Sequence, residues 1–142
     1  MKVSHILTRP LLTIAAGETV LDAARLMVNN NVGLLVISYK QDDSKLVGVI
    51  SERDIIRVIA SGRSLNVAVD EVCTRGVVTV RAGSDVAEAA KAMNKNRIRH
   101  VVVVDDKDKP LGVVSMRDLV GERATLRAIL QSDEKEVFHG AD

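Results

Sequence analysis

The chain contains one long pattern twice, and this internal repeat constrains its fold more than any other feature. Thr8-Arg9 recurs as Thr74-Arg75, 66 residues later. Further identities at the same offset are Ala16-Gly17 with Ala82-Gly83, Ala23-Ala24 with Ala89-Ala90, and Met27 with Met93. After the next loop the offset becomes 64, so the first copy carries two extra residues there. Two copies of this length predict a pair of equivalent units related by a pseudo-two-fold axis.

Each copy predicts the same order of elements: strand, helix, strand, strand, helix. Thr19 and Asp85 are typical N-caps, each followed three residues later by an acid. The apolar runs at 33–39 and 98–104 are too continuous for half-exposed strands, which predicts burial on both faces. A polar turn and a second strand then complete a hairpin. These second strands are expected at 46–50 and 111–114, with closing helices from Ser51 and Ser115.

The fold class predicted from this order is α+β, with two β-α-β-β-α repeats packed together. The expected boundaries are residues 1–62 for the first repeat, 63–68 for a linker, 69–131 for the second repeat and 132–142 for a polar tail. The tail is expected to be partly disordered or to contact a partner. At 142 residues the chain is long enough to bury a core without disulfides or a metal.

Composition argues against several classes of function. Aromatic residues are only 1% of the chain, so the core must be aliphatic, and platforms for stacking single-stranded nucleic acid are missing. Twenty Lys and Arg against nineteen Asp and Glu give a net charge of +1. That balance provides no general basic field for a nucleic acid duplex or an anionic membrane. A local basic patch remains possible, so nucleic acid binding is disfavoured rather than excluded.

The reactive residue types are sparse. The single cysteine, Cys73, excludes a disulfide framework and fits a reducing compartment. His5 and His139 have no partners at metal-ligand spacing, so no metal site is expected. Apolar runs are far shorter than the ~20 residues that span a bilayer, and the N-terminus lacks a secretory pattern. A soluble, cytoplasmic protein is expected.

The motif best suited to chemistry is Gly48-Val-Ile-Ser51-Glu-Arg53-Asp54, which returns as Gly112-Val-Val-Ser115-Met-Arg117-Asp118. One interpretation is purely structural, because Ser-x-x-Asp is nearly a capping box for a helix start. The other is functional. A helix N-terminus suits an anion, Arg adds a planar fork for phosphate, and a carboxylate accepts two hydrogen bonds from a ribose diol. Phosphate and diol together indicate a nucleotide.

This doubled unit, with its motif after the hairpin, resembles the tandem CBS-domain pair, or Bateman module. The segment 96–105, in which Arg99-His100 precedes four valines, is similar to the second-strand signature of that family. The resemblance covers about residues 1–125. It implies a non-enzymatic module that binds an adenosine-containing ligand in clefts between its two repeats.

The resemblance also implies roles for individual residues. Asp54 and Asp118 would hold ribose hydroxyls, with Ser51, Ser115 and their helix N-termini near phosphate. Arg99 and His100 match basic positions that face phosphates, and Arg53 and Arg117 lie close enough to help. Main-chain groups around Thr13-Ile14 and Thr79-Val80 match segments that read the adenine edge. Because aromatic side chains are missing, the base is expected between aliphatic walls such as Ile14, Val80 and Val114.

The two copies differ at the expected phosphate positions. The second copy has Arg97, Arg99 and His100 where the first has Asn31, Gly33 and Leu34. The second copy therefore has the stronger claim to a phosphate, and Asp118 ranks above Asp54. Which aspartate works with Arg99 and His100 stays open, because clefts of this family mix residues from both repeats.

The predicted function is a regulatory, energy-sensing module that binds an adenine nucleotide, with AMP first and ATP or ADP next. One alternative is a module without a ligand, serving structure or protein interaction. Another is a binder of S-adenosylmethionine or NAD(H). An enzyme is disfavoured, because no acid/base pair, activated nucleophile or metal cluster is present in the sequence and no catalytic cofactor is implied.

The closing helices at 54–60 and 118–130 are apolar enough to need cover beyond one module. The resemblance to CBS pairs, which commonly form flat homodimers through such helices, implies the same assembly here. A C2 homodimer is therefore expected, together with an effector protein that the sequence does not identify.

Overall fold

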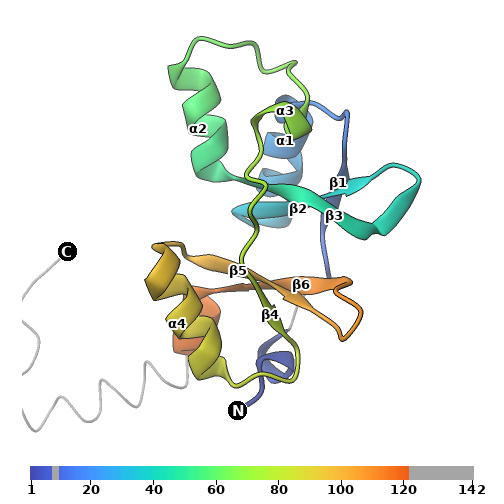
Figure 1. Ribbon diagram of the computed structural model, residues 1–142. Helices are drawn as coiled ribbons and strands as arrows, with labels where there is room; N and C mark the ends of the chain where they lie inside the picture. Colours follow the sequence, from blue (N-terminus) through green and yellow to red (C-terminus); the bar gives the residue numbers. More distant parts are fainter. Residues whose placement is uncertain (8–9, 122–142) are drawn as a thin grey trace, which may run out of the picture.

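The computed structural model describes residues 1–7 and 10–121, and it stacks two small sheets face to face with helices outside them (Figure 1). The first repeat comprises β1 (Thr13–Ala15), α1 (Val20–Asn30), β2 (Leu34–Tyr39), β3 (Asp42–Ser51) and α2 (Glu52–Ala60). The second comprises β4 (Thr79–Arg81), α4 (Val86–Asn96), β5 (His100–Val104), β6 (Pro110–Ser115) and a helix beginning at 116. The predicted α+β class and the predicted order of elements are confirmed.

Both sheets have the same topology. β1 pairs in parallel with β2, which pairs antiparallel with β3, and β4, β5 and β6 repeat this arrangement. The registers also correspond, because Thr13 lies opposite Val36 and Thr79 lies opposite Val102. The repeat in the sequence is therefore a repeat in three dimensions.

The predicted helix starts are confirmed, with one difference between the copies. Thr19 Oγ1 accepts a hydrogen bond from the Asp22 N–H at 3.1 Å, and the Asp22 carboxylate accepts one from the Thr19 N–H at 3.1 Å. This is the expected capping box. Asp85 instead accepts from the N–H of Ala87 at 2.9 Å, only two residues on. Asp85 therefore caps α4 through its own side chain, whereas at α1 the acid at the third helical position completes a capping box.

The core is aliphatic, as expected, and has three parts. Each repeat buries one cluster between its sheet and its helices. A third cluster lies between the two sheets and contains Val36, Val49, Val102 and Val104. Leu35 and Val36, adjacent in β2, are both fully buried and belong to different clusters. The prediction of strands buried on both faces is confirmed.

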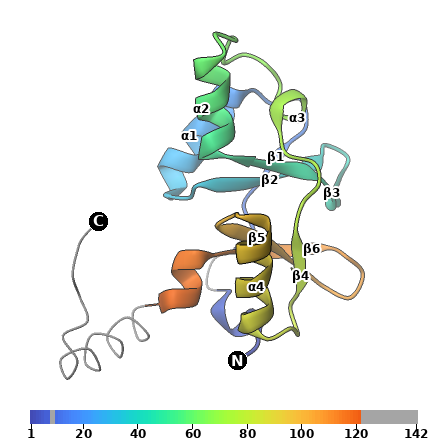
Figure 2. The same cartoon turned by 60° about the vertical axis from the view of Figure 1, so that its left-hand side comes forward.

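The segments that lead into the two repeats are exchanged. Val3, in the 3-10 helix η1 (Val3–Ile6), is buried in the core of the second repeat, and its N–H donates to the Ser84 carbonyl at 2.8 Å. Val69, in α3 (Val69–Val72), is buried in the core of the first repeat, and its N–H donates to the Glu18 carbonyl at 2.8 Å. Figure 2 shows η1 below the second sheet and α3 above the first.

The expected domain boundaries, which assign residues 1–7 to the first repeat and residues from 69 onward to the second, stay a prediction. By packing, each leading segment contributes to the core of the other repeat, since Ile6 and Leu7 join the second core and Val72 and Cys73 join the first. The predicted tail at 132–142 and the closing helix beyond 121 lie outside the described residues. Within the described ranges, no helix is long and apolar enough to cross a bilayer.

Candidate functional site

The first Ser-x-x-Asp motif forms the capping box that its spacing predicts. Asp54 Oδ2 accepts hydrogen bonds from the Ser51 N–H at 2.8 Å and the Ser51 hydroxyl at 3.0 Å, and Ser51 Oγ accepts from the Asp54 N–H at 3.2 Å. The second oxygen, Oδ1, is not used by the cap. It accepts from the Thr74 hydroxyl at 3.5 Å and lies 3.6 Å from Arg57 Nη1. The structural and functional interpretations of the motif are therefore compatible.

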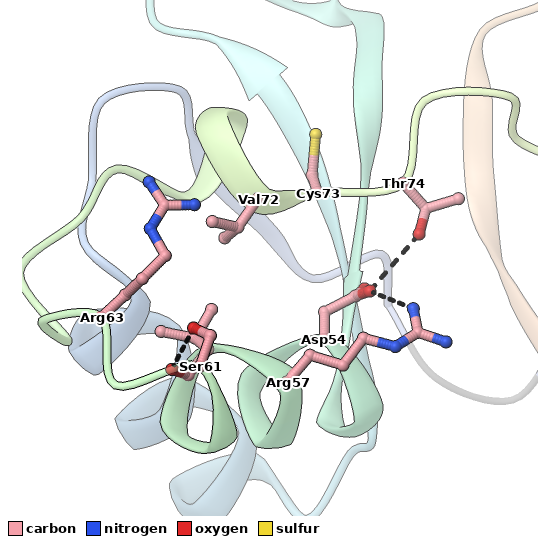
Figure 3. A pocket seen from close by; sticks show the side chains of 8 residues that line it. Asp54, Arg57, Ser61, Arg63, Val72, Cys73 and Thr74 are labelled. Carbon is pink, nitrogen blue, oxygen red and sulfur yellow. Dashed lines mark hydrogen bonds and ion pairs between the residues drawn. The ribbon is translucent and has the colours of Figure 1, made fainter.

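Asp54 lies at the edge of a cavity of about 340 Å³ between α2 and the segment that follows α3 (Figure 3). This volume is at the lower end of the range for small-molecule pockets. The lining residues are Asp54, Arg57, Val58, Ser61, Arg63, Val72, Cys73 and Thr74. Sequence reasoning missed the two arginines and Thr74, although the Thr-Arg pair that marks the repeat was a signal for Thr74.

The cavity offers no activated nucleophile. Burial raises the pKa of the Cys73 thiol, and the nearby Arg75 guanidinium opposes that shift only in part. The thiol therefore stays protonated at neutral pH, as expected for a packing residue. Among the described residues, no three His, Cys, Asp or Glu side chains form a group that could hold a metal ion.

The second motif repeats the cap. Asp118 Oδ2 accepts from the Ser115 N–H at 2.8 Å, and Ser115 Oγ accepts from the Asp118 N–H at 3.1 Å. Asp118 is half-buried, whereas Asp54 is only 5% exposed. Thr8-Arg9, the equivalents of Thr74-Arg75, lie outside the described residues. The ranking of Asp118 above Asp54 stays a prediction.

His100 lies beside the second motif. It begins β5 and pairs with Ser115 across the hairpin. Burial lowers the pKa of His100 below its ordinary value, while the carboxylates of Asp118 and then Glu52 act to raise it. The stronger of these two influences on the pKa comes from Asp118, which is in the same repeat as His100. The weaker comes from Glu52, which is in the first repeat. Arg99 is exposed and acts on His100 in the opposite sense.

The remaining predicted residues are more widely spread. Arg53 and Arg117 are exposed in the first turns of their helices. Thr79 lines a different hollow, of about 490 Å³, with Tyr39, Lys45 and Val104 among its other residues. This hollow lies at the opposite ends of the strands from Ser51 and Ser115, since β2 runs from Leu34, opposite Ser51, to Tyr39. The structure therefore does not bring Thr79 to the cavity beside Asp54.

The expected aliphatic walls need correction. Ile14 is 4% exposed and Val114 is 0% exposed, and both side chains lie in the helix-side cores of their own repeats. Val80 also packs against the second of these cores. Alternation along each strand turns these side chains away from the other repeat. Main-chain groups of Thr13, Ile14, Thr79, Val80 and Val114 therefore stay the candidates for contacting a base.

The arrangement of the two repeats agrees with comparison to known proteins. The sequence profile of the CBS domain matches residues 3–61 and again residues 69–125. The chain belongs to the CBS domain family. Its two repeats form a CBS pair, or Bateman module, with the exchanged leading segments included in the matched ranges.

Two solved CBS structures are similar to this CBS pair over most of its length. The CBS domain protein PAE2072 from Pyrobaculum aerophilum, solved in complex with AMP, is 34% identical with a TM-score of 0.84, covering 92% of this chain and 99% of that one. The CBS pair of protein MJ0100, in complex with 5′-methylthioadenosine and S-adenosyl-L-methionine, is 31% identical with a TM-score of 0.75, covering 84% and 96%. Both neighbours hold adenosyl ligands.

Two curated relatives add less about function. An uncharacterized 17.7 kDa protein of Acidianus ambivalens is 35% identical over 118 residues, covering 83% of this chain and 70% of that protein. The mitochondrial CBS domain-containing protein CBSX3 of Arabidopsis thaliana is 36% identical over 124 residues, but the match spans only 57% of its length.

Proposed function

We propose that this CBS pair is a regulatory module, not an enzyme, that binds an adenine nucleotide between its repeats, with AMP first and ATP or ADP next. The observation that carries the proposal is the divided use of the Asp54 carboxylate. One oxygen caps α2, while the other is held toward a cavity by Thr74 and Arg57. A carboxylate oxygen held in this way is suited to accept hydrogen bonds from a ribose.

Each remaining candidate has a role in this proposal. Asp54 and Asp118 hold ribose hydroxyls, and Arg99 and His100 face the phosphate together with the helix starts at Ser51 and Ser115. Arg53 and Arg117 add charge beside those helix starts. Main-chain groups of Thr13, Ile14, Thr79, Val80 and Val114 are the candidates for reading the base.

A different adenosyl ligand is the second candidate. The CBS pair of MJ0100 holds S-adenosyl-L-methionine and 5′-methylthioadenosine, which lack a phosphate. The Glu52 carboxylate, which acts to raise the pKa of His100, favours such ligands, because its negative charge opposes a phosphate near His100. NAD(H) is a further adenosyl compound to include in the ligand panel.

The test is calorimetric titration with AMP, ADP, ATP, adenosine, S-adenosylmethionine and NAD(H), on the wild type and an Asp54→Asn/Asp118→Asn variant. Wild type is expected to bind at least one of them. The variant is expected to bind about 100-fold more weakly, because two charged acceptors for ribose are lost. Each single variant then shows which aspartate contributes more, and the prediction is Asp118.

Asp22→Asn is the matched control, because Asp22 forms the same capping box at α1. It is expected to lower stability like the site variants and to leave every affinity unchanged. If no adenosyl compound binds wild type, the ligand-free structural alternative holds instead. If Asp22→Asn weakens binding as much as the double variant, the loss reflects stability and the assigned roles of Asp54 and Asp118 are wrong.

We further propose that the module forms a C2 homodimer through its closing helices. Ile56 and Ile59 on α2 are 63% and 59% exposed, and Met116 and Val120 are exposed at the start of the second closing helix. Exposed apolar side chains gathered in this way are typical of an interface. The proposal includes a cytoplasmic location and an effector protein that responds to the ligand, with no membrane or nucleic acid partner.

The expected mass in light scattering at micromolar concentration is that of two chains. Ile56→Asp/Ile59→Asp is expected to halve it, because charges at a buried interface have no partner there. Val28→Asp, at a position on α1 that is 80% exposed, should leave the dimer intact. A wild type that scatters as one chain would refute this arrangement.

A further inference from the structure

The hollow of about 490 Å³ that Thr79 lines lies between the hairpin turns of the two repeats. Tyr39 and Lys45 border it from the β2–β3 hairpin, and Lys107 and Asp108 border it from the β5–β6 hairpin. Figure 1 shows both hairpins projecting from the same side of the module. We call this space the hairpin hollow. Its volume is within the range of small-molecule pockets, and the proposed function does not use it.

The hairpin hollow lies away from the Ser-x-x-Asp motif of the second repeat. β5 begins at His100, opposite Ser115, and ends at Val104, opposite Pro110. A strand rises about 3.3 Å per residue, so this stretch of β5 covers about 13 Å. Val104 lines the hollow, whereas Ser115 starts the helix that the proposed nucleotide uses. A small ligand in the hollow therefore occupies a different site from a phosphate at Ser115.

The hairpin hollow contains two cations that come from different repeats. Neither Lys45 nor Lys107 takes part in an ion pair among the residues that the structure describes. Of the described residues that line the hollow, only Asp108 is an acid, and its Oδ1 atom accepts a hydrogen bond from Arg81 Nη2 at 3.2 Å. Two ammonium groups thus remain for a ligand, while the one carboxylate is already paired.

The wider surroundings of the hollow are neutral. Over the two turns and Arg81, five cations stand against five acids. They are Lys40, Lys45, Arg81, Lys107 and Lys109 against Asp42, Asp43, Asp105, Asp106 and Asp108. A neutral region provides no long-range field for a polyanion. The two lysines therefore suit a small ligand with a single anionic group, which they contact at short range.

The rest of the lining is apolar apart from one hydroxyl. Tyr39 is the single tyrosine of the chain and is 49% exposed, and Leu46, Val104 and Thr79 share the hollow with it. The ladder between β2 and β3 shifts register on both sides of Ser38, next to Tyr39. Bulges of this kind redirect side chains and are common beside active sites. An apolar body attached to the anionic group thus has partners here that an inorganic ion could not use.

The second turn is held by its own hydrogen bonds. Asp105 Oδ1 accepts from the N–H groups of Lys107 and Lys109 at 2.8 and 2.9 Å. The Asp105 carbonyl accepts from Arg81 Nη1 at 2.7 Å. Because the backbone at Lys107 is ordered in this way, a ligand need not order it on binding, which favours affinity.

The pseudo-symmetric position in the second repeat differs. Tyr39 corresponds to Asp105 at the repeat offset of 66, and the two extra residues of the first copy belong to its hairpin turn. An acid thus replaces the ring, and that acid is committed to the backbone of its own turn. The module is therefore expected to have one site of this kind and not a symmetric pair.

We propose that the hairpin hollow binds a small organic acid, with one carboxylate or phosphate group on an apolar body about the size of a ring. Lys45 and Lys107 pair with the anionic group, and Tyr39, Leu46 and Val104 contact the body. Since the two lysines belong to different repeats, the ligand links the two hairpins. This site is additional to the proposed nucleotide site and does not depend on it.

The experiment is NMR titration of the 15N-labelled chain with benzoate and with phenyl phosphate, which separate a carboxylate from a phosphate ligand. Benzamide and inorganic phosphate are the comparisons, since one lacks the charge and the other lacks the body. The ring signals of Tyr39 and the amides of Thr79 and Lys107 are expected to shift saturably with at least one acid. Both comparison compounds should bind about tenfold more weakly or less. The Tyr39 ring signals are assigned directly, because the chain has no other tyrosine.

A Lys45→Gln/Lys107→Gln variant is expected to bind the acid about tenfold more weakly, because both cationic partners are lost. Lys91→Gln/Lys95→Gln is the matched control. It removes the same charge from exposed positions on α4 and should bind as wild type does. Equal weakening in the two double variants would overturn the inference, since the effect would then come from net charge.

The Asp54→Asn/Asp118→Asn variant separates this site from the nucleotide site. It is expected to bind the acid as wild type does, and AMP should not displace the acid. If neither acid shifts the signals of Tyr39, Thr79 and Lys107, or if binding is lost in this variant, the inference is overturned. Failure of every adenosyl ligand to bind, with the acid bound as expected, would overturn only the proposed function.

Discussion

A Val3→Asp variant is expected to lose about 3 to 5 kcal/mol of its free energy of unfolding, since the new carboxylate would be buried without a partner. Val3 is fully buried among Met93, Val101 and other residues of the second core. The damage should therefore fall on the second repeat, although Val3 precedes the first repeat in the chain. Urea denaturation measures the loss of stability.

Native-state hydrogen exchange then locates the damage. Amides of β5 and β6 should lose more protection than amides of β2 and β3, because η1 is hydrogen-bonded to the second repeat through Ser84 and Ala82. Val28→Asp, at an exposed position, is the control and should change neither stability nor protection appreciably. Equal loss of protection in both sheets would contradict the local effect of the exchanged segment.

A Gly48→Ala variant is expected to lose about 2 to 3 kcal/mol of stability, because its methyl group has no room. A Cβ at this position would stand 2.6 Å from the Thr74 carbonyl oxygen and 3.0 Å from Cys73 Sγ. The Thr74 backbone cannot easily withdraw, since its N–H and carbonyl are both hydrogen-bonded to Val49 at 2.9 Å. Gly48 is thus required because the segment at Cys73 and Thr74 passes close to it, not because its backbone angle is unusual.

Gly112→Ala is the matched comparison from the second repeat. There the Cβ would meet the Leu7 Cδ2 atom at 2.8 Å, which is the end of a flexible side chain. Its expected cost is about 1 kcal/mol or less, since Leu7 can change rotamer. Thermal denaturation of both variants gives the order. A Gly112→Ala variant less stable than Gly48→Ala would show that Thr74 and Leu7 are not packed against these two glycines as described.

Local signals in the sequence were sufficient for the elements and their order. The capping residues Thr19 and Ser51 start their helices as predicted, because the hydrogen bonds involved span only three residues. The apolar runs of β2 and β5 indicated burial on both faces, and the polar turns predicted the hairpins β2–β3 and β5–β6. The parallel pairings of β1 with β2 and of β4 with β5 were not predicted from the sequence.

The candidate site was predicted in part. Ser51 and Asp54 lie together as the motif requires, and the same holds for Ser115 and Asp118. A continuous apolar run does not reveal which of its side chains face the helices and which face the other sheet. The side chains of Ile14 and Val114 were therefore expected in the cleft but lie in the cores.

The sequence by itself determined that the chain folds as two equivalent β-α-β-β-α units with capped helices, because periodicity, caps and turns act over a few residues. Only the tertiary structure decided that each leading segment completes the other repeat, and that Thr74 contacts the Asp54 oxygen that the cap does not use. These contacts join residues twenty or more positions apart, and their geometry is set by the packing of the two repeats. No local pattern encodes that packing, which is why these contacts could not be derived from either copy alone.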